Sequence, residues 1–406
     1  MMREVKTMMN LKEHLFFTEY ADPKTGIKSY ILKERVADVQ KHFYFTNTSV
    51  TEDGKFLWIL CATPPAKIHT FAIVSLDAQN PYIKHFLAAG YSGVGNIPGI
   101  FPGTHDLIFA EGRSLYKVTE NGEITRLYTL PDEIVKRREI ERVFTHASFS
   151  CDKKKLVLDV HIANKTYVGF YDFETKETEF IDEVFVPFHN HAQFSTKDPN
   201  LLILDQEGWT DPVSGEHGYF KNRTWLLDTK GTRFEPLIQS SWFCRDGSKY
   251  CHDFWSKDGY ICFNDYDRGA FECDDLTREL TCVWNRPICH THTNYDRSLW
   301  VADESPYHWK ETPCKVLLYD RETKKEIEIF SGLPYHGIDP FREFHIDPHP
   351  AFTDDGEYIV STTTVLDGRI DVAITPVKEA LEICRKNGII VEKGDIYYEH
   401  QFKRAV

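Results

Sequence analysis

The chain has 406 residues, of which 41% are hydrophobic and 14% aromatic. This composition supplies enough apolar material for a large core and excludes a disordered or fibrous protein. Its formal net charge of −14 argues against a broad affinity for nucleic acid or for an acidic membrane, because such partners require an excess of Lys and Arg.

The start of the chain and the cysteines bear on the compartment. Residues 1–15 lack the uninterrupted apolar run and the small-residue cleavage site of a signal peptide, and no stretch has the length and hydrophobicity of a membrane span. The ten cysteines are scattered without a CxxC pair, which favours buried thiols over a disulfide framework or a zinc ribbon. We therefore expect a cytoplasmic protein.

Short β-rich runs separated by turn signals recur along the chain. One pattern repeats: a polar or aromatic lead-in, Phe or Trp with Ser or Thr, a turn containing Asp, and an apolar strand. The clear units, in chain order, are SVTEDGKFLWIL from Ser49, ASFSCDKKKLVLDV from Ala147, AQFSTKDPNLLIL from Ala192, DFWSKDGYICF from Asp253, THTNYDRSLWVA from Thr291 and PAFTDDGEYIV from Pro350. A weaker unit starts at His105, which makes seven.

Most units are followed by a second hairpin, such as VGFYDFETKETEFI from Val168. Four short antiparallel strands repeated seven times predict an all-β, seven-bladed β-propeller with four-stranded antiparallel blades. We expect a single domain over residues 1–406, closed by a strand at 28–32 that pairs with the last blade, with a helix-containing extension from about residue 377. An array of β-sandwich domains would need linkers rich in Gly, Ser or Pro, and none is seen.

A histidine occupies the same place before the Asp turn in five consecutive units; these residues are His146, His191, His252, His290 and His349. The first unit has Asn47 there. With 18 histidines in 406 residues, a match at any one position is expected about one time in twenty, so five matches indicate a shared role. In a propeller the innermost strand of each blade lines the axial channel. We place the five positions just before those strands, at the channel mouth, where they converge.

A group of imidazoles serves either to bind a divalent metal or to transfer protons near neutral pH. For any single histidine the alternative is a structural hydrogen bond to the neighbouring blade. Further candidates lie near the last two repeats, namely His292, Glu343, His345 and Asp347. Such a mixed nitrogen and oxygen set suits Mn, Zn or Fe. Cys251 and Cys289, each directly before a site histidine, are expected to point away from the channel as core residues.

Two long insertions, 205–223 and 303–314, are rich in Trp, Tyr and Gly. Aromatic residues over a channel mouth are natural platforms for sugar rings, although packing of the loops themselves explains any one of them equally well.

At HAQFSTKDPNLL, NRTW, CHDFWSKDG, CHTHTNYDRSLWVAD and HPAFTDDG the chain resembles the oligogalacturonate lyases of polysaccharide lyase family 22. The matching segments run in order over residues 188–363. The resemblance implies a bound manganese-type ion and β-elimination at a uronate. By motif, His252 matches the Brønsted base, Arg223 matches the arginine that serves the substrate carboxylate, and His290 and His349 match metal-binding histidines.

The metal shell of that family also contains a third histidine and a glutamine before the last histidine. Here the stretch reads EFHIDPH, so we expect His345 as the third histidine, with Asp347 or Glu343 in place of the glutamine. His191 and His146 are candidates for contact with the substrate, and His191 also for proton relay.

The expected substrate is an acidic oligosaccharide, an oligogalacturonate. Two alternatives stay open: a lyase for another uronate oligomer, such as ulvan fragments, and a non-catalytic interaction propeller of the TolB or WD type.

Overall fold

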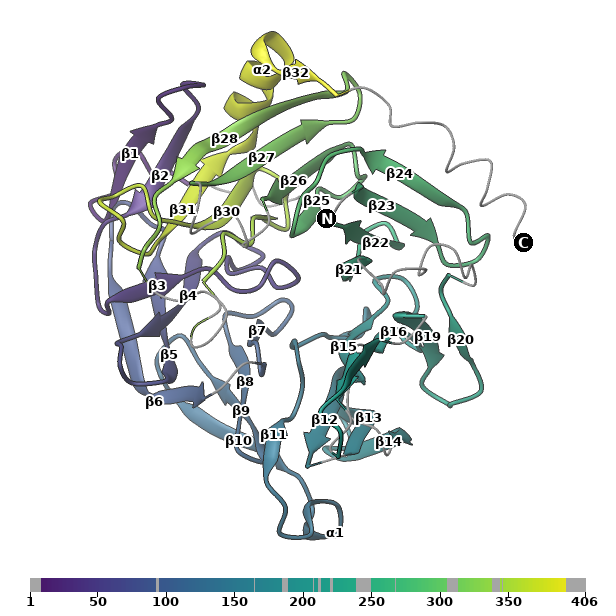
Figure 1. Cartoon of the computed structure of the whole chain (residues 1–406). Helices are drawn as coiled ribbons and strands as arrows, with labels where there is room; N and C mark the ends of the chain where they lie inside the picture. Colours follow the sequence, from purple (N-terminus) through teal and green to yellow (C-terminus); the bar gives the residue numbers. More distant parts are fainter. Residues whose placement is uncertain are drawn as a thin grey trace, which may run out of the picture.

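The computed structural model describes residues 9–92, 95–163, 165–184, 189–206, 208–210, 213–219, 222–238, 250–266, 268–304, 313–337, 344 and 346–391. Within these ranges, seven antiparallel sheets form a ring around a central axis (Figure 1). The expectation of a seven-bladed β-propeller with four-stranded blades is confirmed. No helix in the described ranges is long and apolar enough to cross a membrane.

The first four blades, with strands given from the inside outward, follow one another in the sequence. Blade one contains β3 (Val39–Lys41), β4 (Phe56–Ala62), β5 (Ile68–Ser75) and β6 (Ile83–Ser92). Blade two contains β7 (Gly99–Ile100), β8 (Leu107–Glu111), β9 (Ser114–Val118) and β10 (Ile124–Thr129), followed by the short helix α1 (Asp132–Val135). Blade three contains β11 (Ile140–Arg142), β12 (Lys155–Ile162), β13 (Lys165–Asp172) and β14 (Thr178–Val184). Blade four contains β15 (His189–Phe194), β16 (Leu201–Gln206), β19 (Thr224–Asp228) and β20 (Phe234–Pro236), with the hairpin β17 (Gly208–Thr210) and β18 (His217–Tyr219) inserted.

The last three blades complete the ring. Blade five contains β21 (Tyr250–Trp255), β22 (Tyr260–Asp265), β23 (Gly269–Asp274) and β24 (Leu280–Trp284). Blade six contains β25 (Thr291–Thr293), β26 (Leu299–Asp303), β27 (Cys314–Asp320) and β28 (Lys325–Leu333), with β32 (Ile389–Ile390) added at its outer edge. Blade seven combines β29 (Ala351–Phe352), β30 (Tyr358–Thr363) and β31 (Asp371–Pro376) with the N-terminal β2 (Lys28–Leu32) and β1 (Phe17–Ala21).

Both ends of the described chain join the last two blades. Tyr30 and Ile31 of β2 pair with Ile374 and Ala373 of β31, as expected for the closing strand, and β1 adds a second strand outside it. The helix α2 (Val377–Asn387) follows β31, which confirms the expected C-terminal helix. Its buried residue Ala380 belongs to the apolar cluster shared by blades six and seven.

The repeated Ser/Thr and Asp of the sequence pattern form one type of turn. The hydroxyl of Ser150 donates to Asp152 at 2.6 Å and accepts the backbone N–H of Lys155, the first residue of β12, at 2.9 Å. The same pair of hydrogen bonds recurs in three other blades, at Thr51, Ser256 and Thr353. The motif therefore recurs because it reverses the chain between the inner two strands.

The apolar core lies between neighbouring blades. The second strands are buried on both faces, as in β4 and β12, so Ile59 of blade one packs in one cluster with Val360 of blade seven. Each fully buried aliphatic side chain of this kind contributes roughly 1.5–3 kcal/mol. Because every blade is covered by its neighbours, closing the ring completes the core.

An ion-paired histidine links blades one and two. His105 Nε2 lies 3.0 Å from Asp53 Oδ2, and its Nδ1 is hydrogen-bonded to Glu120. Partial burial alone would lower the pKa of His105, but the hydrogen bonds and charges of the two carboxylates outweigh it and raise that pKa.

We expect His105→Gln to destabilise the protein at pH 5.5 and to have little effect at pH 9. Because the pKa of His105 is higher in the folded protein than in the unfolded chain, protonation of His105 stabilises the fold. This contribution is complete at a pH below the ordinary histidine pKa and disappears as the pH rises through the raised pKa. For a partly exposed pair the loss at pH 5.5 should be less than about 1 kcal/mol. Urea unfolding of both proteins at the two pH values measures it, and an equal loss at both would contradict a role for the charge.

Candidate functional site

The five aligned histidines converge on the propeller axis. Neighbouring rings are in contact, with centroid separations of 4.7 Å for His146 and His191, 4.1 Å for His252 and His290, and 4.3 Å for His290 and His349. Residues separated by up to 203 positions in the sequence, 349 − 146, thus form one cluster. The repeat alignment located this cluster, because equivalent inner positions of the blades point to one axis.

The backbone of three of these residues adopts an unusual conformation. His191, His252 and His349 have φ values of 53°, 58° and 44°, in the left-handed region that non-glycine residues avoid at a cost of roughly 1–3 kcal/mol. The expectation that all five precede the innermost strand is wrong for three of them, because His146 follows β11, the innermost strand of blade three, and the other two lie inside their inner strands. His191 lies within β15 and His252 within β21, each where the register of the strand pair shifts. Such bulges re-aim a side chain, which is common beside functional sites.

Tyr44 lies at the centre of the cluster, and the repeat alignment missed it. Its ring centroid is 4.7 Å from both His146 and His349, with the ring of His146 stacked at 26°, and it is 5% exposed. The centroids of the other three histidines lie 5.6–6.5 Å away. Asn47, which the alignment placed there, instead donates to the carbonyl of Ala147. The aromatic run HFYF at residues 42–45, just upstream of Asn47, was the sequence feature from which Tyr44 could have been identified.

One part of the cluster combines imidazole and carboxylate groups. Potential ligand atoms of His290, Asp347 and His349 lie within 4.8 Å of one another, and all three residues are buried. The structure therefore brings together three of the four residues expected to bind a metal. The fourth, His345, and also Glu343, lie outside the described residues.

Lys41 of β3 lies beside this group. Its side chain is 6% exposed, and its Nζ donates to the carbonyl of Phe344 at 2.5 Å. Burial lowers the pKa of Lys41 to about 8, while the charge of Asp347 acts in the opposite direction. A buried ammonium group is costly without nearby negative charge, so Lys41 and Asp347 stabilise each other electrostatically.

Asp303, at the end of β26, orients two of these residues. Its carboxylate accepts the backbone N–H of His290 at 2.8 Å and that of His349 at 3.0 Å. It also lies 3.0 Å from His290 Nδ1, so the other ring nitrogen, Nε2, is the one available as a ligand. Burial lowers the pKa of His290, but Asp303 outweighs burial and raises it. A carboxylate behind a histidine is the usual support of a metal ligand.

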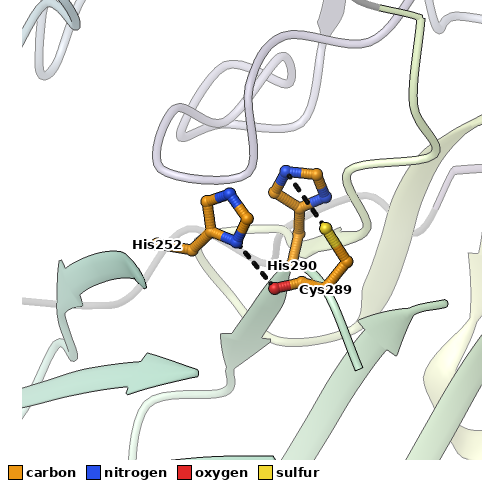
Figure 2. Close-up of side chains that lie close together, drawn as sticks. All are labelled: His252, Cys289 and His290. Atoms are coloured by element: carbon orange, nitrogen blue, oxygen red, sulfur yellow. Dashed lines mark hydrogen bonds between the residues drawn. The ribbon is translucent and has the colours of Figure 1, made fainter. Parts of the chain in front are cut away.

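His252 belongs to a different part of the cluster. Its Nδ1 lies 2.8 Å from the carbonyl oxygen of Cys289 (Figure 2), so Nδ1 carries the proton and Nε2 carries the lone pair. Burial, assisted by the neighbouring charges of His290 and Arg223, holds the pKa of His252 well below its ordinary value. The imidazole is therefore neutral at pH 7 and able to accept a proton.

Arg223, just before β19, is 8% exposed and anchored by Asp205. Its Nε and Nη2 each lie 3.0 Å from the same carboxylate oxygen, Oδ2. Its positive charge is one of the causes that lower the pKa of His252. The structure thus places the predicted arginine and the predicted base in one electrostatic environment.

Cys289 differs from the expectation that it points away from the site. It is buried, but its Sγ lies 3.9 Å from His290 Nε2 (Figure 2). Cys289 also forms a second possible metal-binding group with His252 and His290. Burial raises the pKa of Cys289 well above its ordinary value, so the sulfur is a thiol, and only a metal that displaces its proton would bind there.

The remaining histidines have distinct surroundings. His191 Nδ1 lies 3.1 Å from His146 Nε2, so one ring donates to the other. His292 is outside the cluster: its Nδ1 accepts the backbone N–H of Phe352, and its ring stacks on Phe254 with a 5.4 Å centroid separation. His292 therefore serves as a link between blades.

The fold and this cluster define a seven-bladed β-propeller with imidazole, carboxylate and thiol groups buried on its axis. No family model matches the chain. An oligogalacturonate lyase from Dickeya dadantii is 22% identical over 209 residues, which cover 47% of this chain and 50% of the relative. The chain thus matches about half the length of that curated relative.

Two solved structures resemble the whole propeller. An oligogalacturonate lyase in complex with manganese is 20% identical with a TM-score of 0.70, covering 91% of this chain and 98% of the other. An oligogalacturonate lyase from Vibrio parahaemolyticus is 20% identical with a TM-score of 0.69, covering 90% and 98%. The resemblance inferred from the motifs is confirmed, and the chain shares the fold of these lyases.

We expect Asp303→Asn to weaken binding of Mn²⁺ by about 10- to 100-fold, because the amide no longer holds His290 as the carboxylate does. Isothermal titration calorimetry on the purified protein measures the affinity.

Asp159→Asn is the matched control. Asp159 bridges blades three and four by accepting the backbone N–H groups of Thr145 and Ala192, without contact to the His290 group. If Asp159→Asn weakens Mn²⁺ binding as much as Asp303→Asn does, then Asp303 affects the metal only by stabilising the fold, and its role in orienting His290 is contradicted.

Proposed function

We propose that this chain is a metal-dependent lyase that cleaves short oligogalacturonates by β-elimination and releases unsaturated uronate products. The observation that carries the proposal is the neutral, partly buried His252 next to the group formed by His290, Asp347 and His349. The names of the relatives supply the substrate class.

The donor set fits a divalent metal. Two imidazole nitrogens and one carboxylate oxygen, from His290, His349 and Asp347, suit Mn²⁺, Zn²⁺ or Fe²⁺. Manganese is our first candidate, because one similar structure is described as a manganese complex. We include His345 as a further ligand, on the motif alone. When bound, the ion neutralises the substrate carboxylate and so acidifies the adjacent C–H bond.

The protein's own groups carry the other steps. His252 Nε2 takes the proton α to the carboxylate, since its Nδ1 is fixed by the Cys289 carbonyl. Arg223, held by Asp205, binds the substrate carboxylate and stabilises the charge that develops on it. His191 and His146, whose ring centroids lie 6.4 and 4.7 Å from that of Tyr44, are proposed to contact the rest of the oligosaccharide.

The cytoplasm is the proposed location. All nine cysteines in the described ranges are free, which agrees with a reducing compartment. The proposed partner is the acidic oligosaccharide itself.

We expect His252→Ala to reduce formation of unsaturated product from digalacturonate by about 10²- to 10⁴-fold, the usual contribution of a general base. Ultraviolet absorbance of the C4=C5 double bond measures the rate. Metal content should stay unchanged, and its loss would place His252 among the ligands instead. His85→Ala, on the outer strand β6, is the control that should keep full activity.

Removing the metal with a chelator should abolish the activity, and Mn²⁺ should restore it.

His349→Ala should lower the metal content measured by elemental analysis of the purified protein. Absence of a stoichiometric metal, together with no cleavage of any uronate oligomer, would favour a non-catalytic interaction propeller. Cleavage of ulvan fragments without cleavage of digalacturonate would assign the other uronate substrate.

A further inference from the structure

Tyr266 lies beside the base, in the connection between β22 and β23. Its Oη is 3.5 Å from His252 Nε2, and the two rings meet edge to face with centroids 5.6 Å apart. The separation is at the outer limit of a hydrogen bond, so the hydroxyl lies next to the lone pair of Nε2 without binding it tightly.

Elimination requires a proton donor as well as a base, because the leaving oxygen departs as an alkoxide unless it is protonated. Among the groups with a direct contact to His252 Nε2, Tyr266 carries a suitable proton. Burial raises the pKa of Tyr266, which keeps the phenol protonated at neutral pH.

We propose that Tyr266 is the catalytic acid of this site for 4-linked glucuronate and that it works together with His252 from one face of that sugar ring. This inference rests on the proposed lyase function. His252 Nε2 takes the proton from C5, and the electron pair of that C–H bond forms the C4=C5 double bond. The C4–O bond breaks, its electron pair stays on the oxygen, and that oxygen takes the proton of Tyr266. The phenolate then recovers a proton from the imidazolium 3.5 Å away, and both side chains return to their starting states.

The spacing of the two groups selects the configuration of the substrate. Atoms 3.5 Å apart reach the C5 hydrogen and the C4 oxygen together only when these lie on the same face of the ring. They do so in glucuronate, whereas in galacturonate they lie on opposite faces. The site therefore also accepts 4-linked glucuronate. With galacturonate the leaving oxygen points away from Tyr266 and takes its proton from water.

The test compares wild type and Tyr266→Phe on digalacturonate and on β-1,4-linked diglucuronate. Wild type should cleave both. The variant should lose about 10²-fold or more in kcat on diglucuronate and less than about threefold on digalacturonate. A glucuronate with nitrophenolate as the C4 leaving group needs no acid, so the variant should cleave it at a rate close to that of wild type.

Equal losses on both disaccharides, or no loss on either, would overturn the role of Tyr266, as would failure of wild type to cleave diglucuronate while it cleaves digalacturonate. If wild type cleaves neither, the lyase function itself fails. Tyr116→Phe, on β9 of blade two, is the matched control and should leave all three rates unchanged. Retained near-ultraviolet circular dichroism of Tyr266→Phe excludes misfolding as the cause of a loss.

Discussion

The site depends on buried carboxylates that join the inner strands of neighbouring blades. Asp303 accepts backbone N–H groups from His290 of blade six and His349 of blade seven, and Asp159 does the same between blades three and four. A blade alone has no means of fixing the angle to its neighbour. The hydrogen bonds of Asp303 and Asp159 fix the angle between neighbouring blades close to the histidines. The geometry of the site therefore depends on how the blades assemble into the ring.

Burial lowers the pKa of both His290 and His252, but the groups around the two rings differ. At His290 the charge and hydrogen bond of Asp303 outweigh burial and raise the pKa, whereas at His252 burial outweighs the hydrogen bond to the Cys289 carbonyl and holds the pKa well below its ordinary value. Groups with the same chemistry, whose ring centroids are 4.1 Å apart, are therefore suited to different tasks. This division supports the assignment of His290 to the metal and His252 to proton transfer. The left-handed backbone at His252 shows that the fold accepts strain to place this ring.

Two members of the site, Tyr44 and Tyr266, have no repeat signature. They come from a loop after an inner strand and from a hairpin connection, whereas Asp303 lies on the second strand of its blade, as Asp159 does. Asp303 stood within the quoted motif CHTHTNYDRSLWVAD, but its role depends on the backbone of His349, which the motif does not contain. Similarly, the direction of the Cys289 thiol follows from the local chain path, and strict strand alternation predicted it wrongly.

The sequence by itself determined the number of blades, the closing strand 28–32, the C-terminal helix and the five histidines that share a position, because these features are local patterns repeated along the chain. It also carried the resemblance to oligogalacturonate lyases. Only the tertiary structure decided which histidines touch, which nitrogen of His252 is free to accept a proton, and that Tyr44 occupies the centre. These properties depend on distances and burial between blades, and such quantities arise only when residues far apart in the sequence close into a ring.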